Sequence, residues 1–168
     1  MDEIKKLIRS LSKIPLFYGL SNAELETVLG ICKPDSFQNN EIIFNENDPS
    51  HSMYIILSGE VDITSVKTGL IYTLHSCDIF GEIGLITQKT RSANAIAQAS
   101  CKLLRIDHTN FNFLLGTHPR ISAVIMKNIS SNLANHLIRM NNVSLEHIPQ
   151  ACKQDAEIES QVLINHPK

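Results

Sequence analysis

The sequence predicts a mainly β fold flanked by helices, an antiparallel sandwich or barrel such as a jelly roll. Three observations lead to this fold class. Between residues 37 and 107, six short segments rich in β-branched and aromatic residues are separated by turn signals. No long helical pattern interrupts these segments, as it would in a fold that alternates strands and helices. The apolar residues on either side recur at helical spacing instead.

The N-terminal segment, residues 1–36, is predicted to be helical. Its first apolar residues repeat every three or four positions, and Pro15 ends this helix because proline cannot continue one. Ser21 and Glu24 have the spacing of a capping box, which predicts a second helix that ends at Gly30.

The β region, residues 37–107, follows. The predicted strands occupy residues 41–44, 53–57, 61–66, 70–74, 93–97 and 102–106. Glycine-containing pairs such as Ser58-Gly59 and Thr68-Gly69 mark turns between them.

The C-terminal segment, residues 108–148, returns to helical spacing, and Pro119 suits the first turn of a longer helix. Residues three and four apart form a stripe along it: Met126, Ile129, Leu133, His136, Met140, Val143 and His147. Such a stripe suits a homodimer through this helix, and it suits a helix that covers the β region equally well. Residues 149–168 are predicted to form a polar tail.

Composition excludes several classes of protein. The 168 residues fit one domain, and 15 Lys and Arg against 17 Asp and Glu give a net charge of −2. No global positive field exists to attract nucleic acid or anionic lipid, so we expect neither as a direct partner. The sequence shows no signal peptide and no apolar run of membrane-spanning length, so the expected location is cytoplasmic.

Motifs for catalysis and metal binding are absent from the sequence. The four cysteines include no CxxC pair, and the histidines do not cluster at metal-ligand spacing. Neither a G-x-S-x-G motif nor a P-loop with its lysine occurs. We therefore expect no metal, no cofactor and no enzymatic activity.

The strongest functional signal is the segment FGEIGLITQKTRSAN, residues 80–94. Gly81 and Gly84 would let backbone N–H groups approach an anion closely. Arg91 would add a planar fork of donors that can grip two phosphate oxygens, with the Ser92 hydroxyl beside it.

A carboxylate lies in the same segment. Glu82 accepts hydrogen bonds when ionised, so it suits a sugar hydroxyl rather than a phosphate. Donors for an anion next to an acceptor for a hydroxyl predict a phosphorylated sugar as the ligand. The candidate ligand-binding residues are Phe80, Gly81, Glu82, Ile83, Gly84, Leu85, Arg91, Ser92, Ala93 and Asn94.

The order F-G-E-I-G-L, followed after five residues by R-S-A, resembles the phosphate-binding cassette of cyclic nucleotide-binding domains. Upstream, IPLFYGLS and MYIILSGEV resemble the N-terminal helical segment and an early strand and turn of that family. The resemblance covers about residues 10–145 and extends to the sensor domains of catabolite activator protein and of cyclic-nucleotide-dependent kinase regulatory subunits. It implies an eight-stranded double-stranded β-helix, or jelly roll, with N-terminal helices and a long C-terminal helix.

The resemblance also implies roles for matching residues. Arg91 and Ser92 would bind the cyclic phosphate, and Glu82 and Gly81 the ribose 2'-hydroxyl. The long C-terminal helix would close over the base as a lid, through Arg139, Met140 and Asn141.

Three positions depart from the family's pattern. Asn47 and Cys77 stand where many members have glycine, and Thr90 stands where proline is common before the arginine. None of these changes removes a phosphate donor. Ser92 leaves the choice between cAMP and cGMP open, because its hydroxyl can serve the phosphate of either or the guanine of one.

The function that the resemblance implies is a stand-alone sensor of cAMP or cGMP that regulates an unidentified effector protein in signal transduction. One alternative is a ligand-free, degenerate domain that serves as a protein interaction module. Another is a transcription regulator that lacks its own DNA-binding domain, since Lys153 and Lys168 are the only Lys or Arg after residue 147.

Overall fold

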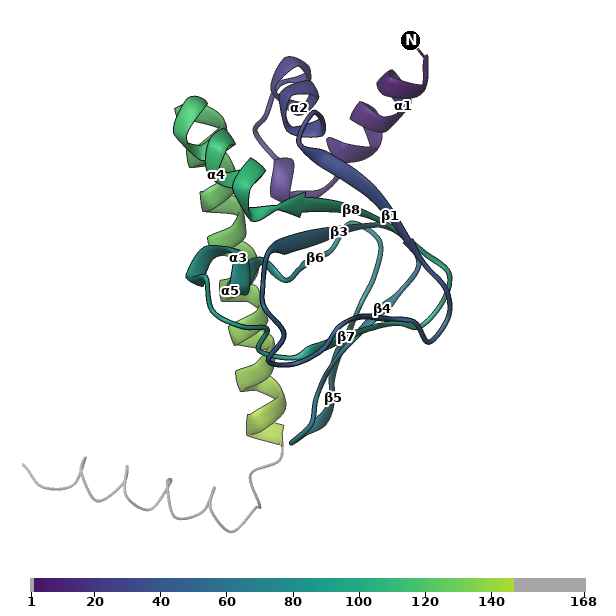
Figure 1. Ribbon diagram of the computed structural model, residues 1–168. Helices are drawn as coiled ribbons and strands as arrows, with labels where there is room; N and C mark the ends of the chain where they lie inside the picture. Colours follow the sequence, from purple (N-terminus) through teal and green to yellow (C-terminus); the bar gives the residue numbers. More distant parts are fainter. Residues whose placement is uncertain (1, 147–168) are drawn as a thin grey trace, which may run out of the picture. The chain divides into compact units, whose positions relative to one another are not determined.

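A computed structural model describes residues 2–146 of the chain, with side chains from residue 7 to residue 138. These residues form a mainly β fold in which eight antiparallel strands make two sheets with helices around them (Figure 1). The predicted jelly roll with N-terminal helices and a long C-terminal helix is confirmed. Residues 2–129 pack as one unit, and residues 130–146, which continue the last helix, belong to a second.

Each sheet has four strands. The first has the order β1-β8-β3-β6, with β1 (Cys32–Phe37), β8 (Cys101–Asp107), β3 (Ser52–Ser58) and β6 (Ile79–Phe80). The second has the order β2-β7-β4-β5, with β2 (Ile42–Phe44), β7 (Asn94–Ala97), β4 (Val61–Ser65) and β5 (Gly69–Leu74). All six predicted strands are confirmed to within one residue at each end.

Strands β1 and β6 were not predicted, and all of β1 except its last residue, Phe37, lies within residues 1–36, which were expected to be helical. Its sequence, CKPDSF, is mostly polar and contains Pro34, so it lacks an apolar alternation. Proline is tolerated there because β1 lies at the edge of its sheet. Strand β6 has two residues, too few for any periodicity to identify.

The core between the sheets is a cluster of aliphatic and aromatic side chains that includes Tyr54, Ile56 and Phe80. On β3 the alternate residues Met53 and Ile55 are also fully buried, so this strand is covered on both faces. A strand covered on both faces shows a continuous apolar run, and this explains why residues 53–57 show no polar alternation.

The helices are α1 (Asp2–Leu11), a short 3-10 turn η1 (Pro15–Phe17), α2 (Asn22–Leu29), α3 (Glu82–Thr87), α4 (His108–Thr117) and α5 (Pro119–Glu146). The predicted capping box is confirmed, since the Ser21 side chain accepts from the Glu24 N–H and the Glu24 side chain accepts from the Ser21 N–H. Helix α2 ends at Gly30 as predicted. No helix among residues 2–146 is long and apolar enough to cross a bilayer.

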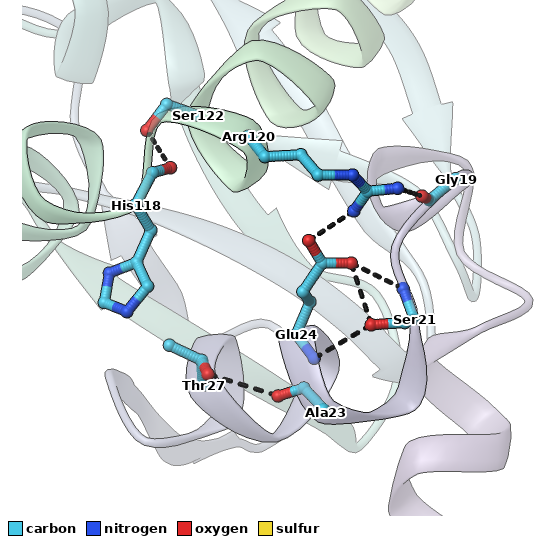
Figure 2. A network of polar contacts seen from close by, with 8 residues as sticks. All are labelled: Gly19, Ser21, Ala23, Glu24, Thr27, His118, Arg120 and Ser122. Carbon is cyan, nitrogen blue, oxygen red and sulfur yellow. Dashed lines mark hydrogen bonds and ion pairs between the residues drawn. The ribbon is translucent and has the colours of Figure 1, made fainter.

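A polar network joins the first turns of α5 to the segment before the sheets (Figure 2). Arg120 forms an ion pair with Glu24 and donates to the Gly19 carbonyl at 3.2 Å. Further along α5, the Asn128 side-chain amide donates to the carbonyls of Leu16 and Tyr18, both at 2.9 Å. The start of α5 is therefore fixed to η1 and α2.

Candidate functional site

The site begins where β6 turns into α3. Phe80 ends β6, and Gly81 precedes the helix with a left-handed φ of 77°. A Cβ at Gly81 would lie 2.5 Å from Nη1 of Arg91, so both the backbone angle and the space require glycine. The short helix α3 then packs against β3.

The guanidinium of Arg91 is the centre of the site. The residue is 5% exposed, its Nη1 donates to the Gly81 carbonyl at 3.1 Å, and its Nη2 donates to the Ser52 hydroxyl at 3.2 Å. Its Cζ lies 4.0 Å from the centre of the Phe44 ring, which allows a cation–π contact. Phe44 belongs to an aromatic cluster in which the rings of Tyr54 and Phe80 are stacked 5.1 Å apart.

The positive charge of Arg91 lacks an anionic partner. Among the described side chains, no carboxylate lies within 4.0 Å of its nitrogens. Its Nε is buried and has no hydrogen-bond partner among the described residues. Burial lowers the pKa of Arg91, while electrostatic interactions with Tyr54, Asp48 and Glu82 act in the opposite direction. A guanidinium remains protonated in spite of this, so the site holds a buried cation with unused donors.

Glu82 is 3% exposed at the start of α3. Burial raises the pKa of its carboxyl, and a hydrogen bond from its own backbone and the charge of Arg91 oppose the rise. The same surroundings affect Tyr72, whose pKa is raised to about 12 by burial and by the charges of Glu82 and Asp78. Acceptor and cation thus face one pocket without forming an ion pair.

The residues around Arg91 enclose a pocket of about 390 Å³, counting the part that opens to solvent. Eight of its lining residues are predicted site residues: Phe80, Gly81, Glu82, Ile83, Gly84, Arg91, Ser92 and Ala93. Sequence reasoning missed three others, Phe44, Ile63 and Tyr72, which come from strands β2, β4 and β5.

Two predicted site residues do not line this pocket. Leu85 is 2% exposed within the core. The side chain of Asn94 accepts from the Glu46 N–H at 2.8 Å and donates to the Thr64 carbonyl at 3.3 Å, so it joins the loop after β2 to β4.

The turn that contains Asn47 and Asp48 holds the backbone of Arg91 through two hydrogen bonds. The Asn47 N–H donates to the Arg91 carbonyl and the Arg91 N–H donates to the Asp48 carbonyl, both at 2.9 Å. Asn47 has φ of 70°, and Cys77 has φ of 78°. Both positions where the family often has glycine therefore adopt the left-handed conformation here, which asparagine tolerates better than cysteine.

The predicted lid residues lie in α5, at positions where side chains are outside the described residues: Arg139, Met140 and Asn141. Their role as a lid stays a prediction. So does the homodimer through the stripe on α5, whose last member, His147, also lies outside the described residues. Within the part of the chain that the structure describes, no group of three His, Cys, Asp or Glu side chains could hold a metal ion.

Comparison with known proteins agrees with this geometry. Residues 34–118 match the model of the cyclic nucleotide-binding domain, a range that contains every residue lining the pocket. The chain is similar to Glutaminase 1 of Bradyrhizobium diazoefficiens, with 33% identity over 131 residues, which cover 78% of this chain and 21% of that protein. It is also similar to a cAMP-dependent protein kinase regulatory subunit of Dictyostelium discoideum, with 29% identity over 113 residues, covering 63% of this chain and 35% of that protein.

The chain therefore spans about a fifth to a third of the length of these two curated relatives. Among solved structures, a cyclic nucleotide-binding domain from Methylobacillus flagellatus has the same fold. Its TM-score is 0.77 at 20% identity, and the match covers 88% of this chain and 85% of that one.

Proposed function

Because the chain belongs to the cyclic nucleotide-binding domain family, we propose that it binds a cyclic nucleotide, cAMP or cGMP, in the pocket around Arg91. The cyclic phosphate is held by the guanidinium, by the Ser92 hydroxyl and by backbone N–H groups at the start of α3. The ribose 2'-hydroxyl donates to Glu82.

One observation carries this proposal: Arg91 is buried, positively charged and without a carboxylate partner among the described residues. A buried charge is costly unless it is paired. The Nε–H of Arg91 has no acceptor within the part of the chain that the structure describes. A phosphodiester supplies one negative charge and several acceptor oxygens. Charged hydrogen bonds of this kind contribute about 1.5–3 kcal/mol each.

The second part of the proposal is regulatory. A ligand that binds one conformation better than another shifts the equilibrium between them by its difference in affinity. The chain would act through such a shift on a protein effector. Support comes from the regulatory subunit of Dictyostelium discoideum, to which the chain is similar.

Titration calorimetry with cAMP and with cGMP tests the binding. We expect saturable binding of at least one nucleotide, and the ratio of the two affinities gives the base preference. The 5'-monophosphates serve as controls, because they retain base and ribose but carry an open, doubly charged phosphate. A matching rise in melting temperature is expected, since a ligand that binds only the folded state stabilises it. No heat and no thermal shift at millimolar nucleotide would favour a ligand-free interaction module instead.

A further inference from the structure

Ser52 lies on β3, far from the predicted cassette in sequence, yet its hydroxyl accepts a hydrogen bond from Nη2 of Arg91 at 3.2 Å. We propose that Ser52 is a positioning residue, which fixes the guanidinium of Arg91 in the orientation that receives the ligand's phosphate. The inference rests on the proposed function for its ligand, and on the contacts of Ser52 for its geometry.

The guanidinium is held at two corners by different kinds of group. Nη1 donates to the Gly81 carbonyl, a backbone group, at 3.1 Å. Nη2 donates to Ser52, which supplies the one side-chain hydrogen bond to this group within the described residues. Without that second contact, one hydrogen bond and the Phe44 ring remain to hold the group, and its slow rotation about the Nε–Cζ bond should become faster.

These two bonds decide which donors remain for a ligand. A guanidinium has five N–H donors in a rigid plane. Two of them are engaged by Gly81 and Ser52, so the Nε–H and one N–H on each Nη remain. From residue 7 to residue 138, where side chains are described, Nε has no hydrogen-bond partner. Fixing the plane in advance removes an ordering cost that binding would otherwise bear.

The position of Ser52 is itself rigid. It pairs with Asp107 in the register of β3 and β8, and it is 7% exposed. Its carbonyl oxygen lies 3.2 Å from the place that a Cβ at Gly81 would occupy, so strand and cassette are in close contact here. Because the strand is fixed, the Ser52 hydroxyl can hold the Arg91 guanidinium in one orientation.

Ser50 provides a matched control two residues earlier. It is 8% exposed, and its buried hydroxyl has no hydrogen-bond partner among the side chains and backbone that the structure describes. Ser50→Ala and Ser52→Ala therefore remove the same atom from equally buried sites, but only the second removes a bond to Arg91.

Calorimetry on the four proteins, wild type, Ser50→Ala, Ser52→Ala and Ser52→Thr, measures the effect on affinity. We expect Ser52→Ala to weaken binding of the preferred cyclic nucleotide about three- to tenfold. Ser50→Ala and Ser52→Thr, which both leave a hydroxyl at position 52, should stay near wild type. In an Arg91→Leu background, Ser52→Ala should cause no further loss.

A ligand-free measurement separates this inference from the proposed function. In nitrogen-15 NMR spectra, slow rotation about Nε–Cζ gives the two Nη nitrogens of Arg91 separate signals. We expect these signals to merge at a lower temperature in Ser52→Ala than in wild type or Ser50→Ala.

The outcomes are distinct. If no cyclic nucleotide binds the wild type but the Nη signals change as expected, the proposed function fails while the positioning role stands. Unchanged Nη signals in Ser52→Ala, or equal losses of affinity in Ser50→Ala and Ser52→Ala, would overturn the role of Ser52.

Discussion

The buried guanidinium of Arg91 should lower the stability of the ligand-free protein, and binding of an anion should offset this effect. Arg91→Leu removes that cation and keeps an apolar side chain over Phe44. We expect the free variant to melt at the same or a higher temperature, because hydrophobic replacements of buried charges are often neutral or stabilising. Its affinity for cyclic nucleotide should fall at least about tenfold. Thermal unfolding with and without nucleotide measures both effects.

Arg9→Leu is the control for this change, since Arg9 is exposed on α1. It should leave the nucleotide-dependent rise in melting temperature intact. A full nucleotide response in Arg91→Leu would contradict the role of the guanidinium.

Sequence reasoning could single out those pocket residues that lie close together in the sequence. Gly81, Glu82 and Arg91 stand close together in an unusual order, and all of them line the pocket. Phe44 and Ser52 could not be identified in the same way. An apolar residue and a serine in a strand look like many others, and only strand pairing brings them to Arg91.

The short helix α3 depends on close packing against the segment before β3. A Cβ at Gly84 would lie 1.9 Å from the Ser50 hydroxyl oxygen and 2.4 Å from the Ser50 Cβ. We expect Gly84→Ala to destabilise the fold by about 1–3 kcal/mol, as overpacking generally does. Chemical denaturation of the purified variant provides the measurement.

Two further variants make that expectation specific. Gly116→Ala on α4 has open space around its new Cβ, so it should be neutral or stabilising by up to about 1 kcal/mol. Adding Ser50→Gly to Gly84→Ala removes both clashing atoms and should restore most of the lost stability. An unaltered unfolding midpoint for Gly84→Ala alone would refute the packing argument.

Among whole elements, those with long patterns were predictable from the sequence. The capping box at Ser21 marked the start of α2, and Pro119 marked the start of α5. The polar edge strand β1 and the two-residue β6 have no pattern of their own, because partner strands define them. The order of strands within each sheet rests on such long-range pairing, so the sequence pattern did not predict it.

For the molecule as a whole, Glu82 and Glu24 should affect the free energy of unfolding in opposite ways as the pH changes. Burial raises the pKa of Glu82 above 4.5 in the folded state. Its stabilising effect is therefore present below that value and is lost as the pH rises through the folded-state pKa. Glu82→Gln cannot ionise, so it should become more stable than wild type as the pH increases from 4.5 to 7.5, measured by denaturant unfolding.

Glu24 provides the opposite case in the same experiment. Its hydrogen bond from Arg120 and those from Ser21 lower the pKa of Glu24 from 4.5 to about 2. Its stabilising effect is present above 4.5 and is lost as the pH falls toward 2. Glu24→Gln should thus be less stable than wild type at neutral pH, and this difference should shrink in acid. Equal pH profiles for Glu82→Gln and wild type would contradict the burial of an ionisable Glu82.

The attachment of α5 to η1 and α2 has a practical consequence for anyone cloning this domain. The family match begins at residue 34, but Asn128 and Arg120 bond to Leu16, Tyr18, Gly19 and Glu24, all of which precede it. An N-terminal expression boundary at residue 34 would remove these hydrogen-bond and ion-pair partners of α5. A fragment that keeps these contacts between α5 and residues 16–24 must therefore begin before η1.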